Sequence, residues 1–253
     1  MWSRAELKRN AKEVLKGSYF SAFIASLFVG LFTGADNFGG VFTAKSNNAE
    51  EFAILEQELN KLGEVSPEMI FAAAAIIIAA ILFASAMAKI FAIFVTEPFK
   101  VGESHYLLEA TQFRFSFSNV FYGFTCGKYL NVVMTMFLTS LFQFFWTLLF
   151  IIPGFVKAFA YYLVPFIMAE NPNISPKQAI NISCRMTKGY KWDMFVLDLS
   201  FIGWYLLGTL CFGIGVMFVR PYHKATLAQL YLALRTNALD SGRVSLSELE
   251  AGM

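Results

Sequence analysis

Long runs of apolar residues alternate with short charged segments along this chain. The clearest run extends from residue 69 to 95 and carries a single charge, Lys89, near its far end. A second run covers residues 129–152. Both runs are long enough for an α-helix to cross a bilayer, which takes about 20 residues. The pattern therefore predicts membrane-spanning helices as the main elements of the protein.

Four further apolar runs are shorter and are bounded by glycine or proline. Residues 18–34 form the first, and residues 155–169 follow the Pro153-Gly154 step, where proline interrupts a helix and glycine permits a reversal. The last apolar region, residues 195–234, is too long for one helix, and Gly213-Ile-Gly215 divides it into spans 195–212 and 216–234. The sequence thus predicts an all-α, polytopic fold with about six transmembrane helices in a single membrane domain.

The segments between these spans have distinct characters. Residues 1–17 predict an amphipathic helix that lies at the membrane interface, because apolar and basic residues occupy opposite faces. A cleavable signal peptide is the alternative for the first span, but the charged segment ahead of it is long and contains two glutamates. Residues 35–68 predict an acidic extracytoplasmic loop. The aromatic-rich residues 96–128 predict an interfacial helix or loop, since an open strand edge is excluded from a bilayer.

Basic residues collect on one side of this topology. With six crossings, fourteen Lys and Arg residues fall on the side that holds both chain ends, and two fall in the 35–68 loop. The positive-inside rule then places both termini, including the 235–253 tail, in the cytoplasm of a bacterial cell membrane. The main alternative has five crossings, with the last apolar region as one helix and with Arg235 and Arg243 exported.

Composition agrees with a membrane protein and narrows the function classes. The chain is 57% hydrophobic and 15% charged, whereas soluble domains average about 45–50% and 25%. A net charge of +2 does not favour a nucleic-acid partner. Three separated cysteines and two histidines argue against a disulfide framework, a metal site or another cofactor. The expected partners are the lipid bilayer and either another membrane protein or a second copy of this chain.

Ionisable residues inside predicted spans are the candidate functional residues, because a charge in a bilayer is costly. Asp198 is the first candidate, and its alternative role is pairing with a basic neighbour such as Lys191 or capping a helix beside Ser200. The other candidates lie near the last two hairpins, where they could line an anion-accepting pocket or extend to the headgroups: Lys157, Arg220, His223 and Lys224.

A ridge of small residues recurs every four positions in the second span and predicts close packing of another helix rather than a binding site. Its members are Ala80, Ala84, Ala88 and Ala92. No standard catalytic motif occurs in the chain, so no catalytic residue is assigned and a protein that is not an enzyme is expected.

Several segments together resemble a bacterial membrane-protein family called domain of unknown function 975. They are Arg4–Lys8, Leu15–Tyr19, the LLFIIPG turn at Leu148–Gly154, ENPNIS with the following QAI and serine at Glu170–Ser183, Lys188–Gly208, Phe212–Gly215 and Pro221-Tyr222. The resemblance covers most of the chain and is weakest over residues 35–68 and 113–119. It implies a multi-pass protein of the bacterial cytoplasmic membrane and implies no activity.

Three functional hypotheses follow from these observations. The first is a non-enzymatic membrane scaffold or accessory component that works through helix packing. The second is a small transporter or channel-like carrier with a site between the last two hairpins, favoured by broken helices and buried charges. The third, an intramembrane enzyme acting on lipid, needs two carboxylates or a nucleophile–base pair, and Asp198 is the one carboxylate inside a predicted span.

Overall fold

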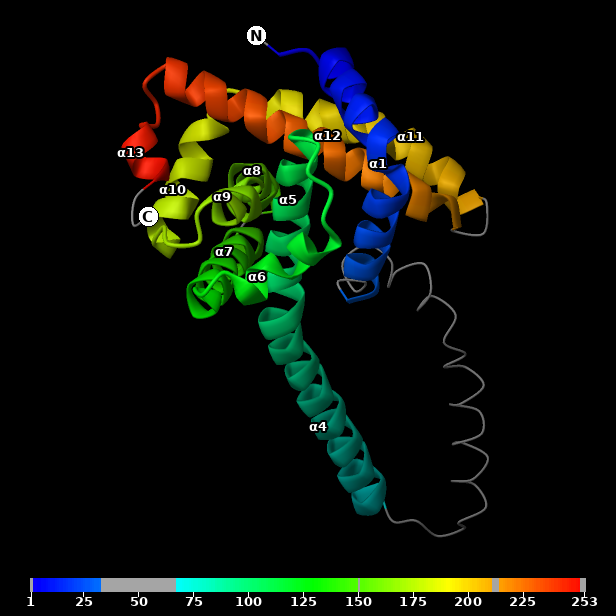
Figure 1. Cartoon of the computed structure of the whole chain (residues 1–253). Coiled ribbons are helices and arrows are strands. Elements are labelled where there is room, and N and C mark those ends of the chain that lie inside the picture. Colours follow the sequence, from blue (N-terminus) through cyan, green and yellow to red (C-terminus); the bar gives the residue numbers. More distant parts are fainter. Residues whose placement is uncertain (1, 33–66, 150, 211–213, 251–253) are drawn as a thin grey trace. The chain divides into compact units, whose positions relative to one another are not determined.

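The computed structural model describes residues 2–32, 67–149, 151–210 and 214–250, and every regular element in these ranges is a helix (Figure 1). The all-α prediction is confirmed. The chain divides into two compact units, residues 34–92 and the remainder. The acidic loop predicted at 35–68 falls, except for its last two residues, outside the described ranges.

The smaller unit contributes one described helix, α4 (Pro67–Phe91). Its composition is almost wholly apolar, and large side chains such as Phe71, Ile78 and Phe83 are exposed. Ala80 and Ala84 of the predicted ridge are also exposed, and the side chains of Ala88 and Ala92 lie outside the described part of the structure. A π-helical turn, Ala92–Thr96, follows α4 in the chain.

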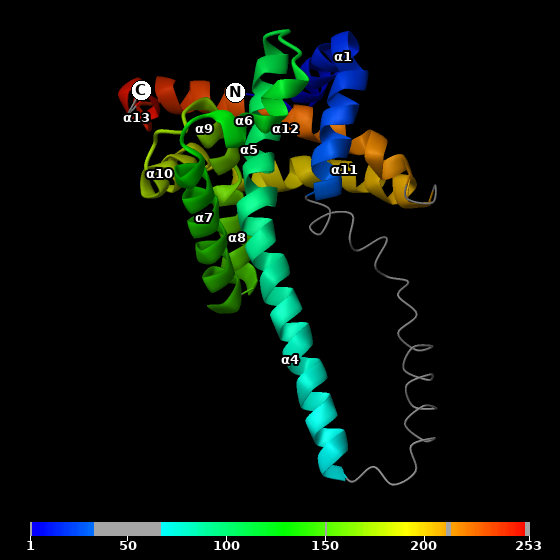
Figure 2. The ribbon, with the colours of Figure 1, turned by 60° about the horizontal axis from the view of Figure 1, so that its bottom comes forward.

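The larger unit begins with α1 (Arg4–Phe32), a single helix of 29 residues. It joins the predicted amphipathic helix and the first predicted span without a break. Its buried residues recur at helical spacing on one face: Leu7, Ala11, Val14, Leu15, Ala22, Ala25 and Val29. This face packs mainly against α12 (Ile214–Asp240) and α5 (Glu97–Thr111), and Figure 2 shows α1 beside α12.

Helix α5 lies in the core of this unit, which differs from the surface position predicted for residues 96–128. It packs on the segment formed by a short 3-10 helix, Phe117–Phe121, and α6 (Tyr122–Thr125). Two glycines allow the backbones to touch. A Cβ on Gly102 would lie 1.8 Å from the carbonyl oxygen of Val120, and one on Gly123 would lie 2.2 Å from that of Pro98. Phe121 and Phe124 of this segment contact Phe99 of α5, whereas Phe113 and Phe117 are exposed.

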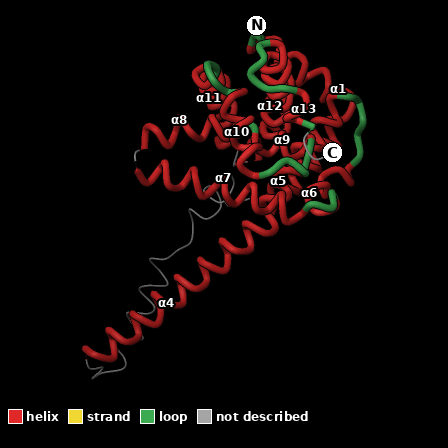
Figure 3. The backbone as a smooth tube through the Cα atoms, turned by 90° about the vertical axis from the view of Figure 1, so that its left-hand side faces the viewer, coloured by secondary structure: helices red, strands yellow, loops and turns green. Residues whose placement is uncertain are grey.

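Two helical pairs complete the middle of the unit. Helices α7 (Tyr129–Leu149) and α8 (Ile151–Tyr161) run side by side, as Figure 3 shows. Pro153 lies in the first turn of α8, and Gly154 lets that helix approach Thr147 of α7. Helices α11 (Lys191–Leu210) and α12 form the second pair and approach most closely at Gly208 and Gly215.

Short helices close the unit around α9 (Val164–Glu170), which is almost completely buried. They are α10 (Pro176–Met186) and α13 (Leu246–Leu249). The side-chain amide of Asn171, just after α9, donates a 2.9 Å hydrogen bond to the carbonyl oxygen of Leu249. The C-terminal segment is thereby attached to the centre of the unit.

Two of the described helices, α7 and α11, are long and apolar enough to cross a membrane by length and composition. Shorter apolar stretches occur at Tyr19–Val29 in α1 and Phe71–Ile81 in α4. Six crossings are therefore not confirmed, and all six spans stay predictions.

Candidate functional site

An acidic side chain from α11 and an imidazole from α12 form the centre of the candidate site. His223 Nε2 lies 3.0 Å from Asp198 Oδ1, and His223 Nδ1 lies 3.0 Å from the hydroxyl of Tyr205. Asp198 and Tyr205 are seven residues apart on α11, so both side chains leave the same face of that helix. The ring of Phe201, between them on this face, stacks on the imidazole at 4.5 Å.

A second charged group lies one helical turn away along α12. Glu103 of α5 places Oε2 at 3.6 Å from Arg220 Nη2 and at 3.5 Å from Lys224 Nζ. The Glu103 and Arg220 side chains are only 3% and 8% exposed, so this ion pair is shielded from solvent. These distances exceed the usual 2.7–3.2 Å of an N–H···O hydrogen bond. In the described part of the chain, Glu103 Oε1 is buried without a hydrogen-bond partner.

The structure thus brings together four of the five ionisable candidates and separates the fifth. Asp198, Arg220, His223 and Lys224 meet where α11 and α12 pack, with Glu103 supplying a second carboxylate. Lys157 instead lies over the indole ring of Trp146, 4.7 Å from its centroid, where α7 and α8 pack. This is a cation–π contact.

Asp198 pairs with His223 rather than with Lys191, the neighbour proposed from the sequence. Sequence reasoning also missed Glu103 and Tyr205. Glu103 lies in a segment that was assigned to the membrane surface, and its charge looked ordinary there. A signal was present in the neighbouring Gly102, because a glycine within a helix marks a close approach of another backbone.

A third polar cluster holds the start of the ENPNIS segment. Arg235 of α12 binds the carboxylate of Glu170 with two nitrogens, Nη2 at 2.6 Å from Oε1 and Nε at 3.1 Å from Oε2. The hydroxyl of Tyr231 donates a hydrogen bond to Oε2 of the same carboxylate. Bidentate geometry of this kind fixes both partners, so the cluster holds the end of α9 against α12.

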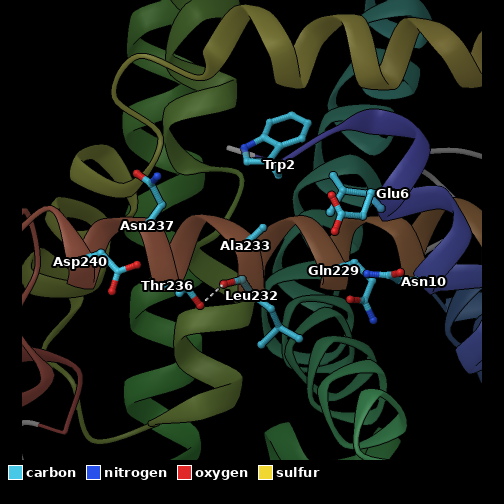
Figure 4. A pocket seen from close by; sticks show the side chains of 10 residues that line it. Trp2, Glu6, Asn10, Gln229, Leu232, Ala233, Thr236, Asn237 and Asp240 are labelled. Atoms are coloured by element: carbon cyan, nitrogen blue, oxygen red, sulfur yellow. Dashed lines mark hydrogen bonds between the residues drawn. The ribbon is translucent and has the colours of Figure 1, made fainter.

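Three of the surface hollows among the described residues are lined by residues other than the Asp198–His223 and Glu103–Arg220 pairs. One hollow of about 410 Å³ lies between the first turns of α1 and the C-terminal half of α12. Figure 4 shows Glu6 and Asn10 on the α1 side and Gln229 and Asn237 on the α12 side. Its lining is polar and includes no group of three potential metal ligands among the described residues.

Outside the predicted spans, burial lowers the pKa of His105. Its Nδ1 lies 2.9 Å from the carbonyl oxygen of Ala169, so this nitrogen donates, and its ring stacks on Tyr122 at 3.7 Å. A lowered pKa keeps the imidazole neutral near pH 7, because its ordinary value is about 6.5. His105 is therefore a packing residue that joins α5 to the end of α9.

Comparison with known proteins finds a match to one protein family. The model of a family described as "Protein of unknown function (DUF975)" matches residues 148–238. No curated protein and no solved structure matches the chain. The matched segment runs from the end of α7 to the end of α12 and includes the four clustered candidates, although not Glu103. The resemblance is thereby confirmed over residues 148–238, and within this segment the chain is similar to the DUF975 family.

Proposed function

We propose that the protein is a multi-pass membrane protein and acts there as a non-enzymatic scaffold or accessory component through helix packing. The observation that carries the membrane assignment is the exposure of α7 and α11. Only 22% of the apolar window of each helix is buried. A core helix of a soluble protein with this composition would be mostly covered, since large exposed apolar patches are rare on soluble proteins.

Both exposed faces consist of large apolar and aromatic side chains. On α7 they include Phe142, Phe144, Phe145, Leu148 and Leu149, and on α11 Leu199, Ile202, Leu206, Leu207 and Leu210. A bilayer is the solvent that matches such faces. The fourteen-to-two distribution of basic residues supports six crossings with both termini in the cytoplasm.

Topology and membrane integration are tested together. The full chain is expressed with a reporter after Met253 that is active only in the cytoplasm, and membranes are washed with alkaline carbonate. We expect the protein in the pellet and an active reporter. Release by carbonate would overturn the membrane assignment. An inactive reporter at normal protein level would overturn six crossings in favour of five.

The scaffold assignment is supported by how the interior charges are satisfied. Asp198 and His223 lie within hydrogen-bond distance of each other, and Glu103 faces Arg220, so each of these polar groups has a partner within the helix bundle. Ala80 and Ala84 are exposed, so this small-residue ridge is available to a membrane-protein partner or a second copy. Close approach of backbones at such ridges is a common means of helix association in membranes.

Complementation of a deletion strain separates packing from chemistry. Ala84→Leu is expected to abolish complementation, because a larger side chain keeps the partner helix away. Ala79→Leu is the control. It makes the same change at a position about 100° around the axis of α4 from Ala80, and it is expected to leave complementation intact. Lys157→Ala and Asp198→Asn are also expected to complement. Full activity of Ala84→Leu, or equal loss in both alanine variants, would contradict the scaffold assignment.

A carrier with a site between the last hairpins is the second candidate. The observation that favours it is Glu103, whose Oε1 is buried without a hydrogen-bond partner among the described residues. Loss of complementation by Asp198→Asn at normal protein level, with Ala84→Leu still active, would favour this alternative.

A further inference from the structure

A groove between α1, α11 and α12 differs from the other hollows in having one cationic end and one apolar end. Its volume is about 730 Å³, and every residue that lines it belongs to the larger unit. Lys8, Lys12 and Lys16 line one part, and Trp204 and Phe218 line another. None of the charged clusters described above uses these residues.

The three lysines form a stripe along α1. They are spaced four residues apart, so successive side chains leave the same face with a rise of about 6 Å. Lys8 Nζ donates a 2.7 Å hydrogen bond to Ser200 Oγ, and Lys12 lies over the ring of Tyr222. In the part of the chain that the structure describes, no carboxylate lies within ion-pair distance of these ammonium groups.

The electrostatics of Lys8 agree with the lack of a carboxylate beside the stripe among the described residues. Burial lowers the pKa of Lys8, and the positive charges of Arg4 and Lys12 lower it further. An anion beside the stripe would offset both effects, because an opposite charge favours the protonated ammonium.

The apolar end of the groove continues in the direction of the first predicted span. Tyr19 follows the lysines along α1, and its hydroxyl donates a 3.0 Å hydrogen bond to the carbonyl oxygen of Phe218. The next turn of α1 adds Phe23, whose ring stacks on Phe218 at 5.0 Å. Trp204 of α11 is 58% exposed at this end.

We propose that this groove binds one anionic phospholipid, with its phosphate at Lys8, Lys12 and Lys16 and an acyl chain along Trp204 and Phe218. The polarity of the groove follows that of a lipid molecule, charged at the end where α1 is amphipathic and apolar where it enters its predicted span. The proposal rests on the membrane location proposed above, independently of the number of crossings, and adds a discrete site to it.

Quenching of tryptophan fluorescence by brominated acyl chains tests the site in the full-length protein in detergent micelles. The probes are brominated phosphatidylglycerol and, as the uncharged control, brominated phosphatidylcholine. Quenching is measured with and without the Trp204→Phe substitution. The difference between the two is the quenching of Trp204, which lines the groove. We expect half-maximal quenching of Trp204 at a mole fraction of phosphatidylglycerol at least roughly tenfold lower than that of phosphatidylcholine. About 1 kcal/mol for each of the three lysines near an anionic headgroup corresponds to a ratio above about 100, so tenfold is the lower bound.

Charge variants then assign the preference to the stripe. Lys12→Gln and Lys16→Gln should each raise the required mole fraction of phosphatidylglycerol by about fivefold. Lys177→Gln, an exposed lysine of α10 that does not line the groove, should leave it unchanged. Lys8 is left intact because of its bond to Ser200. Near-UV circular dichroism confirms that each variant is folded.

Three results would overturn the proposal. The first is an equal half-maximal mole fraction for the two lipids. The second is an effect of Lys177→Gln equal to that of Lys12→Gln or Lys16→Gln. The third is loss of the preference for phosphatidylglycerol in inorganic phosphate but not in chloride of the same ionic strength. The last would assign the lysines to a free anion. If the lipid preference fails while carbonate-washed membranes retain the protein, the lipid site is refuted and the membrane assignment stands.

Discussion

Replacing Glu103 by glutamine should destabilise the larger unit strongly. The substitution keeps the size of the side chain and removes the carboxylate that lies 3.6 Å from Arg220 and 3.5 Å from Lys224. Lys224 is 30% exposed and can extend toward solvent, whereas Arg220 is 8% exposed. The guanidinium therefore loses the Glu103 carboxylate in a shielded environment.

The expected magnitude follows from the cost of breaking a buried ion pair, about 3 kcal/mol or more. For a chain of this size, about 1 kcal/mol corresponds to a change in Tm of about 2–4 °C, so Glu103→Gln should lower Tm by about 6–12 °C. Near-UV circular dichroism during heating in detergent micelles measures this change. All variants are compared at the same heating rate, because unfolding of such proteins is often irreversible.

Glu109→Gln is the matched control, because Glu109 lies on the same helix and makes an ion pair with Arg114, which is 70% exposed. Exposed pairs contribute about 0–1 kcal/mol, so the control should lower Tm by about 4 °C or less. The double variant Glu103→Leu with Arg220→Met should recover most of the loss, since an apolar pair of similar volume can replace a buried ion pair. Equal changes in Tm for Glu103→Gln and Glu109→Gln would refute this reasoning.

Three further predictions concern packing and the C-terminal segment. Gly102→Ala should prevent normal folding, because its Cβ would overlap a backbone carbonyl. Gly203→Ala, whose Cβ would have no atom within 4 Å, should instead raise stability by up to about 1 kcal/mol. Size-exclusion profiles and Tm distinguish the two outcomes. The hydrogen bond and charge of Arg185 lower the pKa of Glu248, so docking of α13 should be stable above the ordinary glutamate pKa of about 4.3 and weaken as pH falls through the lowered value. Hydrogen exchange of residues 244–250 should follow that pH dependence, and Glu248→Gln should abolish it. Arg235→Lys should cost about 1–3 kcal/mol, because an ammonium cannot reproduce the two bonds to the carboxylate; an unchanged Tm would contradict this.

The helical elements were largely predictable because their signal is local. The apolar runs at 69–95 and 129–152 match α4 and α7 closely, since side chains within one segment determine whether it forms an apolar helix. Helix breaks were less predictable. The chain was expected to turn at Pro153-Gly154, yet α8 begins at Ile151, because proline is tolerated in the first turn of a helix.

The sequence predicted only those residues of the candidate site whose charge differs from the apolar residues around them. Asp198, Arg220, His223 and Lys224 were identified because each interrupts an apolar segment. Glu103 was not, because its neighbours in sequence include other charged residues and nothing local distinguishes it from a surface residue.

The sequence by itself determined the all-helical class, the apolar runs and the asymmetric distribution of basic residues, all of which depend on composition over short stretches. The tertiary structure alone decided that residues 97–111 are a buried helix, that Glu103 pairs with Arg220 and that Asp198 pairs with His223. The physical reason is that the cost of burying a charge is offset by a partner from another helix. That partner lies 117 positions away for Glu103 and 25 for Asp198, beyond the reach of any local pattern.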